Sequence, residues 1–258
     1  MATASVCAQQ KIEIPNRQNE KLVGLLHETG SREIVVLCHG FKSNKNSKII
    51  MNLASSLEKE GISAFRFDFS GNGESEGSFN YGNYSYEADD LHSVIQHFTS
   101  KNRVVTTILG HSRGGNVVLL YASKNHICNV INISGRYDLK KGIRLGDGYL
   151  ERIKQQGFVD DAKEGKPVFR VTEKSLMERL NTNMHEACLK IGKDCNVLIV
   201  HGSKDKIVPV ADANEFAKII PNHELEIFKG ADHGYTKHES QLVSRVMKFL
   251  KRVCVMNN

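Results

Sequence analysis

Short apolar runs that alternate with helix-period segments constrain the fold of this chain more than any other feature. Six runs are near-continuous and rich in β-branched residues, as in strands covered on both faces: 34–38, 63–67, 104–109, 129–133, 197–201 and 224–228. Between or after them, apolar residues recur at helical spacing in segments at about 47–60, 86–98, 113–123 and 211–219. This alternation predicts βαβ units and a mainly parallel sheet.

The two ends of the chain complete the predicted sheet and its helical layers. Residues 11–14 and 22–26 have the pattern of an antiparallel edge hairpin around 16–20. A final helix is predicted from one apolar stripe, made by Leu242, Val246, Phe249, Leu250 and Val253. We therefore expect an α/β fold with a mainly parallel, eight-stranded sheet flanked by helices.

Residues 136–194 interrupt the alternation. This interval is charged and contains no convincing core strand. An insertion of this length without structure of its own is uncommon unless it is functional. We predict a small helical cap, or lid, over one end of the sheet, within a single domain that spans 1–258. A second packing layer with no role in binding is the alternative.

Length and charge exclude several classes of protein. The chain has 258 residues, enough for one large α/β domain. Its net charge of +6 comes from 35 Lys and Arg against 29 Asp and Glu, and the basic residues cluster only in pairs, so we expect no nucleic-acid partner. No stretch of eighteen apolar residues occurs, which excludes a transmembrane helix.

The cysteines and the first residues predict an intracellular protein. Residues 1–20 contain no apolar core of a secretory signal. The six cysteines show no C-x-x-C pairing and are expected to be reduced: Cys7, Cys38, Cys128, Cys188, Cys195 and Cys254. Together these features predict a location in the cytoplasm or the nucleus.

The sharpest local signal is Gly-His-Ser-Arg-Gly at 110–114. It follows the predicted strand 104–109 and opens the predicted helix 113–123, which is the strand–turn–helix context that a G-x-S-x-G nucleophile turn requires. Glycines are needed because the turn is so tight that flanking side chains would collide with the neighbouring strand and helix. We predict that Ser112 is a nucleophile.

A serine hydroxyl needs a base to take its proton, and histidine is the usual one. Five histidines follow the start of the cap segment: His185, His201, His223, His233 and His238. His233 lies in a glycine-punctuated loop after the predicted strand 224–228, at the strand end where open α/β sheets place their sites. We expect His201 and His223 to be structural and His238 to face solvent, and a substrate role for His185 stays open.

The third member of such a site is a carboxylate that orients the histidine. Asp205 follows the predicted strand 197–201 by a short loop, which places it at the same edge as His233. Asp232 is the nearest rival, but adjacent residues point in different directions, so it suits loop structure better. Asp194 precedes its strand, and Asp68 is interpreted as a turn or capping residue.

Acyl transfer also requires donors for an oxyanion. The main-chain N–H groups of Arg113, next after the nucleophile, and of Phe41, in the loop after strand 34–38, are the predicted donors. Gly40 allows the main chain to approach closely. We interpret His39 as a structural hydrogen-bonding residue.

Several motifs together resemble the α/β-hydrolase superfamily. They occur in this order: His-Gly-Phe at 39–41, Arg-Phe-Asp-Phe-Ser-Gly-Asn-Gly-Glu-Ser at 66–75, the elbow at 110–115, Gly-Ser-Lys-Asp at 202–205 and Gly-Ala-Asp-His at 230–233. The pattern is similar to the cinnamoyl- and feruloyl-esterase-like serine hydrolases, within the group also called serine aminopeptidase S33 or monoacylglycerol-lipase-like. The resemblance implies a Ser112–His233–Asp205 triad, the oxyanion hole named above, and a lid at 136–194.

The expected function is cleavage of a small carboxylic ester, with an aromatic or hydroxycinnamoyl-type acyl group among the candidates, through an acyl-enzyme. The alternatives are a ligand-binding or receptor-like protein with little turnover, or a thioesterase, acyltransferase, lipase or aminopeptidase. Gly40, Tyr137 and Tyr149 are candidate substrate contacts. No metal or cofactor is expected, and the partner is a small-molecule ester, with the chain acting as a monomer or homodimer.

Arg113 departs from the pattern, because relatives commonly carry a small or amide residue after the nucleophile. Two interpretations remain open: contact with the cap or an anionic substrate, or an ion pair with a nearby acid. The cap has twelve Lys and Arg against nine Asp and Glu between residues 136 and 190. This mildly basic composition gives no support to recognition of a free α-amine.

Overall fold

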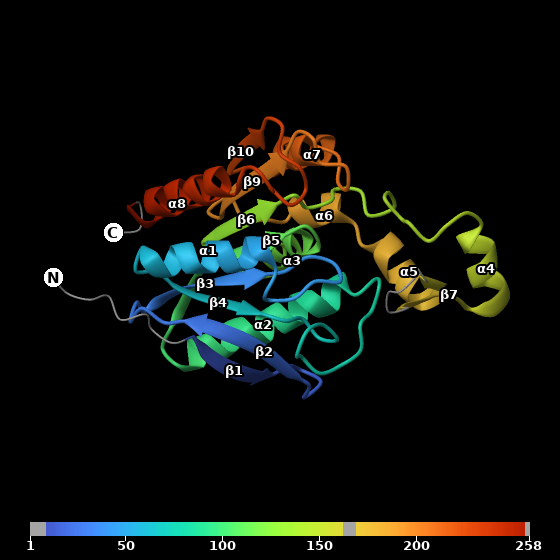
Figure 1. Cartoon of the computed structure of the whole chain (residues 1–258), viewed down its shortest axis with the longest axis horizontal. Helices are drawn as coiled ribbons and strands as arrows, with labels where there is room; N and C mark the ends of the chain where they lie inside the picture. The colour runs from blue at the N-terminus through green and yellow to red at the C-terminus, as the bar shows by residue number, and fades with distance from the viewer. Residues whose placement is uncertain (1–8, 162–168, 256–258) are drawn as a thin grey trace.

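An eight-stranded sheet forms the centre of the molecule (Figure 1), in a computed structural model that describes residues 9–161 and 169–255. The strands are β1 (Gln10–Pro15), β2 (Lys21–His27), β3 (Glu33–Cys38), β4 (Ser63–Phe67), β5 (Val104–His111), β6 (Asn129–Ile133), β9 (Asn196–Gly202) and β10 (His223–Phe228). They lie in the order β1-β2-β4-β3-β5-β6-β9-β10. β2 runs antiparallel to both β1 and β4, and all the other neighbouring strands of this sheet are parallel, so the predicted edge hairpin and mainly parallel sheet are confirmed.

Helices cover both faces of the sheet. They are α1 (Lys48–Lys59), α2 (Tyr84–Ser100), α3 (Arg113–Ala122), α6 (Met184–Cys188), α7 (Ala211–Ile219) and α8 (Glu239–Val255). One apolar cluster joins α1 and α8 to the sheet, and a second joins the other four helices to the sheet's opposite face. This two-sided cover is the reason why the central strands are apolar at almost every position.

Strand β3 shows how the two clusters divide one run of apolar residues. Val36 and Cys38 belong to the cluster of α2 and α3, whereas Val35 and Leu37 belong to the cluster of α1 and α8. Successive side chains point to opposite faces of a strand, and here both faces are buried. Residues 34–38 could therefore be recognised as a strand without any polar alternation.

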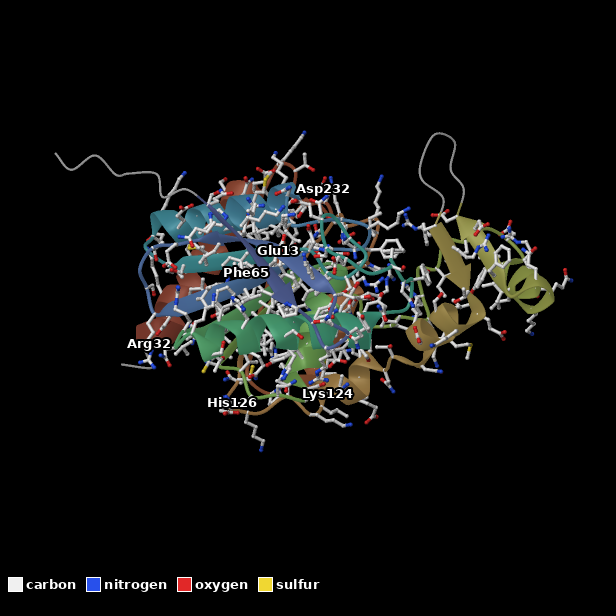
Figure 2. The ribbon with its side chains drawn as sticks, turned by 90° about the horizontal axis from the view of Figure 1, so that it is seen from below. Glu13, Arg32, Phe65, Lys124, His126 and Asp232 are labelled. Carbon is white, nitrogen blue, oxygen red and sulfur yellow. The ribbon has the colours of Figure 1, made fainter. Side chains whose placement is uncertain are left out.

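Phe65 on β4 fills the space beside the antiparallel edge. Its ring is fully buried and lies where a side chain on Gly24 of β2 would stand, because a Cβ there would be 2.0 Å from the ring tip. Figure 2 shows Phe65 within the body of the molecule, with the charged residues Arg32, Lys124 and Asp232 at separate edges of it.

The cap is built around its own small core. It contains α4 (Tyr149–Gln156), β7 (Phe158–Asp161), β8 (Phe169–Thr172) and α5 (Glu173–Asn181), which project beyond one end of the sheet (Figure 1). Its apolar cluster is formed by Tyr81, Leu145, Ile153, Val159, Val171 and Leu176.

The expectation that 136–194 is purely helical is wrong. β7 and β8 form an antiparallel pair in which Val159 faces Val171, and both of these side chains are buried. On the pair's other face, Arg170 donates to Asp160 over 2.8 Å. Each of these strands has only four residues, and half of them are charged or polar. Neither strand can therefore be recognised in the sequence as an apolar run.

The end of the predicted cap segment belongs to the main body. On α6, Met184, Ala187 and Cys188 lie in the same apolar cluster as α3 and α7. These side chains therefore cover the sheet and do not contribute to the small core of the cap.

Four cysteines are free thiols: Cys38, Cys128, Cys188 and Cys195. Burial raises the pKa of both Cys188 and Cys195 to about 12, so these thiols are unreactive near neutral pH. Cys7 and the side chain of Cys254 lie outside the described part of the chain. Among the described helices, none combines the length and the apolar character that a membrane crossing requires.

Candidate active site

Ser112 lies at a sharp turn between β5 and α3. Its φ of 55° and ψ of −117° place it in a conformation that residues other than glycine rarely adopt. The turn is held because the Ser112 N–H donates to the Ile133 carbonyl of the adjacent strand over 2.7 Å. The sharp turn predicted from Gly-x-Ser-x-Gly is therefore present, with the serine in strained backbone.

The flanking glycines are required by space. A Cβ on Gly110 would lie 2.1 Å from the carbonyl oxygen of Gly114, and one on Gly114 would lie 2.4 Å from the carbonyl oxygen of Cys38. Both contacts are with main chain, which cannot move aside as a flexible side chain could. The two glycines let α3 start directly against β3 and β5.

Asp205 and His233 meet at the carboxyl edge of the sheet. Nδ1 of His233 lies 2.6 Å from Oδ2 of Asp205, whose carboxylate is fully buried. The other oxygen, Oδ1, accepts the main-chain N–H groups of Ile207 and Val208 over 2.8 Å each. The carboxylate is thus held in place by its own loop and presents one oxygen to the imidazole.

His201 also lies against this carboxylate, with Nε2 3.4 Å from Oδ2 of Asp205 and 2.9 Å from the Val208 carbonyl. Burial acts to raise the pKa of Asp205, but His201, His233 and the Val208 N–H outweigh it and hold the pKa well below its ordinary value. Asp205 is therefore ionised at neutral pH. His201 has the structural role predicted for it, and its spacing of four residues from Asp205 is the sign of this contact in the sequence.

His111 connects the serine turn to the histidine loop. Burial lowers the pKa of His111 to about 4, so its ring is neutral at neutral pH. Nε2 lies 2.9 Å from the main-chain carbonyl of His233, and a carbonyl only accepts, so this nitrogen carries the proton. The two imidazole rings are 4.9 Å apart. Because His111 adjoins Ser112, this contact brings His233 into the serine's neighbourhood.

The described atoms show no hydrogen bond between the Ser112 hydroxyl and His233. Catalytic hydrogen bonds of this type are often long until a substrate complex forms. Of the three residues of the predicted triad, Asp205 and His233 are thus in contact. Ser112 directly follows His111, which bonds to the main chain of His233.

The loop after β3 lies next to the serine. A Cβ on Gly40 would be 3.3 Å from the Cβ of Ser112, so the main chain passes close to the nucleophile as predicted. His39 beneath it is buried, and burial lowers the pKa of this ring to about 4. Its Nδ1 donates to the Gly40 carbonyl over 2.8 Å and its Nε2 accepts the Phe69 N–H over 3.1 Å, which confirms a structural role.

Arg113 forms a buried ion pair. Its Nε donates to Glu87 on α2 over 2.7 Å, and its other nitrogens donate to the carbonyls of Asn80 and Tyr81. Of the two interpretations offered for this residue, the ion pair with a nearby acid is the one that the structure shows. Burial, opposed by Arg113, raises the pKa of Glu87 to about 7.

Two rival carboxylates have other tasks. Asp232 accepts the N–H and the hydroxyl of Thr236, which confirms its place in the loop structure. Asp68 is a capping residue as predicted, because its fully buried carboxylate accepts the main-chain N–H groups of Lys45 and Glu74, and it also pairs with the Lys45 ammonium over 2.5 Å. This ion pair could not be predicted from the sequence because 23 residues separate the partners.

A cavity of about 270 Å³ opens beside Ser112 and extends under the cap. Its aromatic wall is formed by Phe41, Tyr81, Tyr84 and Phe169. The hollow that contains His233 adjoins this cavity, because Ile207 lines both.

The predicted substrate contacts Tyr137 and Tyr149 do not line this cavity. The Tyr137 hydroxyl instead bonds to Nδ1 of His185, and its ring packs on Phe216 of α7. Tyr149 packs against the small core of the cap. The presence of an aromatic residue in the cap sequence does not tell whether its ring faces the cavity or packs elsewhere. Tyr81 lines the cavity but was not predicted, because it lies before the cap segment in the sequence.

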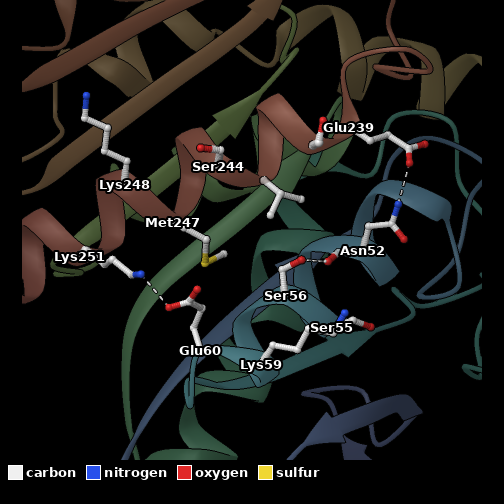
Figure 3. Close-up of a pocket in the computed structure, with 12 residues that line it drawn as sticks. Asn52, Ser55, Ser56, Lys59, Glu60, Glu239, Ser244, Met247, Lys248 and Lys251 are labelled. Carbon is white, nitrogen blue, oxygen red and sulfur yellow. Dashed lines mark hydrogen bonds and ion pairs between the residues drawn. The ribbon is translucent and has the colours of Figure 1, made fainter.

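A larger hollow of about 820 Å³ lies between α1 and α8, on one face of the sheet (Figure 3). Its polar groups pair with one another: Asn52 donates to Glu239 over 3.0 Å, and Lys251 lies 2.7 Å from Glu60. None of the predicted site residues lines it. Within the described residues, no group of three or more His, Cys, Asp or Glu side chains is arranged to hold a metal ion.

Comparison with known proteins matches residues 29–156 to the family model described as "Serine aminopeptidase, S33". The Saccharomyces cerevisiae protein YDL057W is 25% identical over 233 residues, covering 79% of this chain and 69% of its own length. Est1E from Butyrivibrio proteoclasticus, solved with ferulic acid bound, has a TM-score of 0.82 at 23% identity and covers 95% of this chain and 99% of its own. The Pyrococcus furiosus esterase Pf2001 has a TM-score of 0.74 at 23% identity, and the match covers 95% of this chain and 91% of Pf2001. At these identities the structural likeness establishes the fold.

Proposed function

We propose that this chain, which has the α/β-hydrolase fold, is a serine hydrolase that cleaves a small carboxylic ester through an acyl-enzyme. The observation that carries the proposal is the 2.6 Å contact between Asp205 and His233 beside the strained turn at Ser112. A buried, ionised carboxylate that orients a histidine near a partly exposed serine is the arrangement that activates the serine hydroxyl.

In the proposed reaction, Ser112 Oγ attacks the ester carbonyl while Nε2 of His233 takes the hydroxyl proton. Asp205 holds the Nδ1–H and stabilises the imidazolium. The main-chain N–H groups of Phe41 and Arg113 receive the oxyanion. The intermediate collapses, the C–O bond breaks, and the alcohol leaves with the proton from His233. Water, activated by the same imidazole, then releases the acid and regenerates the serine.

The cavity supports a small substrate. Its volume of about 270 Å³ is below the usual range of drug-sized sites, so a long acyl chain would extend beyond it. The aromatic wall of Phe41, Tyr81 and Phe169 suits an aromatic or short aliphatic acyl group. That Est1E was solved with ferulic acid is consistent with a hydroxycinnamoyl-type candidate.

Labelling with a fluorophosphonate probe tests the proposal. The serine oxygen attacks phosphorus and expels fluoride, so only an activated serine reacts. We expect a single adduct on Ser112, lost in Ser112→Ala. Ser134→Ala is the matched control, because Ser134 also follows a strand with a φ of 55° and is fully buried. Absence of an adduct from the folded protein would refute the proposal.

A further inference from the structure

Three arginines of the cavity lining form no ion pair with the described residues: Arg136 and Arg144 from the segment after β6, and Arg179 from α5. Arg136 donates to the carbonyl of Ile207, and Arg144 donates to that of Lys206 over 3.1 Å. Among the residues that the structure describes, no carboxylate lies within 4.0 Å of any of these three guanidinium groups. Each arginine is thus anchored by neutral oxygens and not by a carboxylate.

Arg179 is the most enclosed of the three, with 6% of its surface exposed. Its nitrogens donate to the carbonyls of Leu139 and Lys141 and to the Tyr84 hydroxyl. These bonds fix the guanidinium against the base of the cap. They occupy three of its five N–H groups, so donors remain for a further acceptor.

The carboxylates near the cavity do not cancel this charge. Glu87 is already paired with Arg113, the fourth arginine of the lining. Among the described residues, Asp161 is the one carboxylate on the lining itself. Burial lowers the pKa of Arg136, Asp212 opposes that shift, and Arg179 and Arg144 lower the pKa further. Arg136 is therefore close enough to both of the other cations to be repelled by them.

We propose that this arginine cluster (Arg136, Arg144 and Arg179) binds a free carboxylate on the substrate, so that the preferred ester carries a second, unesterified carboxyl group. The inference rests on the proposed function and names the substrate class of that site. Guanidinium groups bind carboxylates through paired N–H donors, and an anion among three cations relieves their repulsion. A substrate with a free α-amine would be repelled, which disfavours aminopeptidase activity.

The first test compares esters that differ only in charge. Monoethyl adipate is paired with ethyl 5-carbamoylpentanoate, in which a neutral amide replaces the carboxylate at nearly the same size. A second pair, 4-butanoyloxybutanoate and its amide, places the carboxylate on the alcohol side. We expect kcat/KM for the charged member to exceed that of the amide by about 10- to 100-fold in at least one pair, the effect of hydrogen bonds to a charged group.

Arginine variants test the assignment of that preference. Arg136→Met and Arg144→Met are expected to bring the charged-to-neutral ratio towards one. Arg170→Met is the matched control, because Arg170 is also a cap arginine but is exposed, pairs with Asp160 and lies off the cavity lining. It should keep the wild-type ratio. Arg179 is left unchanged because its bonds hold the cap base.

A binding measurement separates this inference from the proposed function. Adipate should raise the melting temperature of Ser112→Ala more than adipamide does, and Arg136→Met in that background should abolish the difference. If Ser112 reacts with the fluorophosphonate but charged and neutral esters are cleaved equally, the inference is wrong and the function stands. If no adduct forms, the proposed function is wrong, and carboxylate binding is then tested by the melting temperatures alone. Equal shifts with adipate and with adipamide refute it.

Discussion

The imidazole of His111 donates its Nε2–H to the main-chain carbonyl of His233 over 2.9 Å. This bond joins the turn that carries Ser112 to the loop that carries the proposed base. The relative position of these two residues therefore depends on a side chain that takes no proton in the proposed reaction.

His111→Phe should lower kcat by about 10- to 100-fold, because a displacement of about 1 Å between reacting groups has effects of that size. KM should change much less, since His111 is absent from the cavity lining. Steady-state kinetics on a short ester measures both. His111→Gln restores a donor and should recover part of the rate. Equal losses in the Phe and Gln variants would contradict a positioning role.

Asp205→Asn should reduce kcat by about 10⁴-fold, the effect reported generally for triad acids converted to amides. The amide cannot stabilise the imidazolium and favours the wrong tautomer of His233. Asp232→Asn is the control, because Asp232 bonds only within its own loop to Thr236. Comparable losses in both variants would argue against the assignment of Asp205 as the acid.

Breaking the buried pair of Arg113 and Glu87 should destabilise the fold. Glu87→Ala leaves the guanidinium without its counterion and should lower the free energy of unfolding by about 3–5 kcal/mol. The double variant Glu87→Met with Arg113→Met should recover most of this loss, because apolar replacements of a buried pair are often nearly neutral. Urea denaturation of the single and double variants measures both effects. A double variant as unstable as the single one would contradict the pairing.

Glu87 should also make stability depend on pH. Its pKa is raised to about 7, whereas the unfolded chain titrates near the ordinary value of about 4.3. Between these values the folded state holds a proton that the unfolded state has lost. The stabilising contribution is therefore complete below about pH 4.3 and is lost as the pH rises to about 7. Within this window, the unfolding free energy of the wild type should fall with pH more steeply than that of Glu87→Gln, and outside it the two slopes should agree. Parallel curves within the window would disprove the assignment.

Gly114→Ala should lower the free energy of unfolding by about 1–3 kcal/mol, the usual cost of overpacking. The added Cβ would stand 2.4 Å from the main-chain oxygen of Cys38. Gly234→Ala has no contact below 3.6 Å, and this exposed site should change stability by no more than about 0.5 kcal/mol. Thermal unfolding of both variants provides the comparison, and equal melting temperatures would rule out the steric argument.

The central sheet was predictable because its strands are long, apolar and covered on both faces. Residues 63–67 and 129–133 coincide with β4 and β6, and 211–219 coincide with α7. The cap was less accessible. β7 and β8 have four residues each and bury one side chain each, so they resemble a polar loop in sequence.

The candidate site divides in the same way. Chain order and strand ends were enough to predict that Asp205 and His233 would be neighbours, and they are in contact. Their catalytic role remains a prediction. The arginine cluster could not be predicted from the sequence, because Arg136 and Arg144 lie in irregular structure whose direction depends on tertiary packing.

The loop from Lys206 to Val208 contacts both the arginines at the base of the cap and the carboxylate of Asp205. Its carbonyls at Lys206 and Ile207 hold Arg144 and Arg136 at the base of the cap, while its N–H groups at Ile207 and Val208 hold Asp205. The cap is consequently not an interchangeable module. Exchanging caps between related hydrolases to alter specificity would require this short loop to be exchanged with them. A foreign cap would lack the arginines that hold the loop, and the position of the N–H groups that bind Asp205 would change.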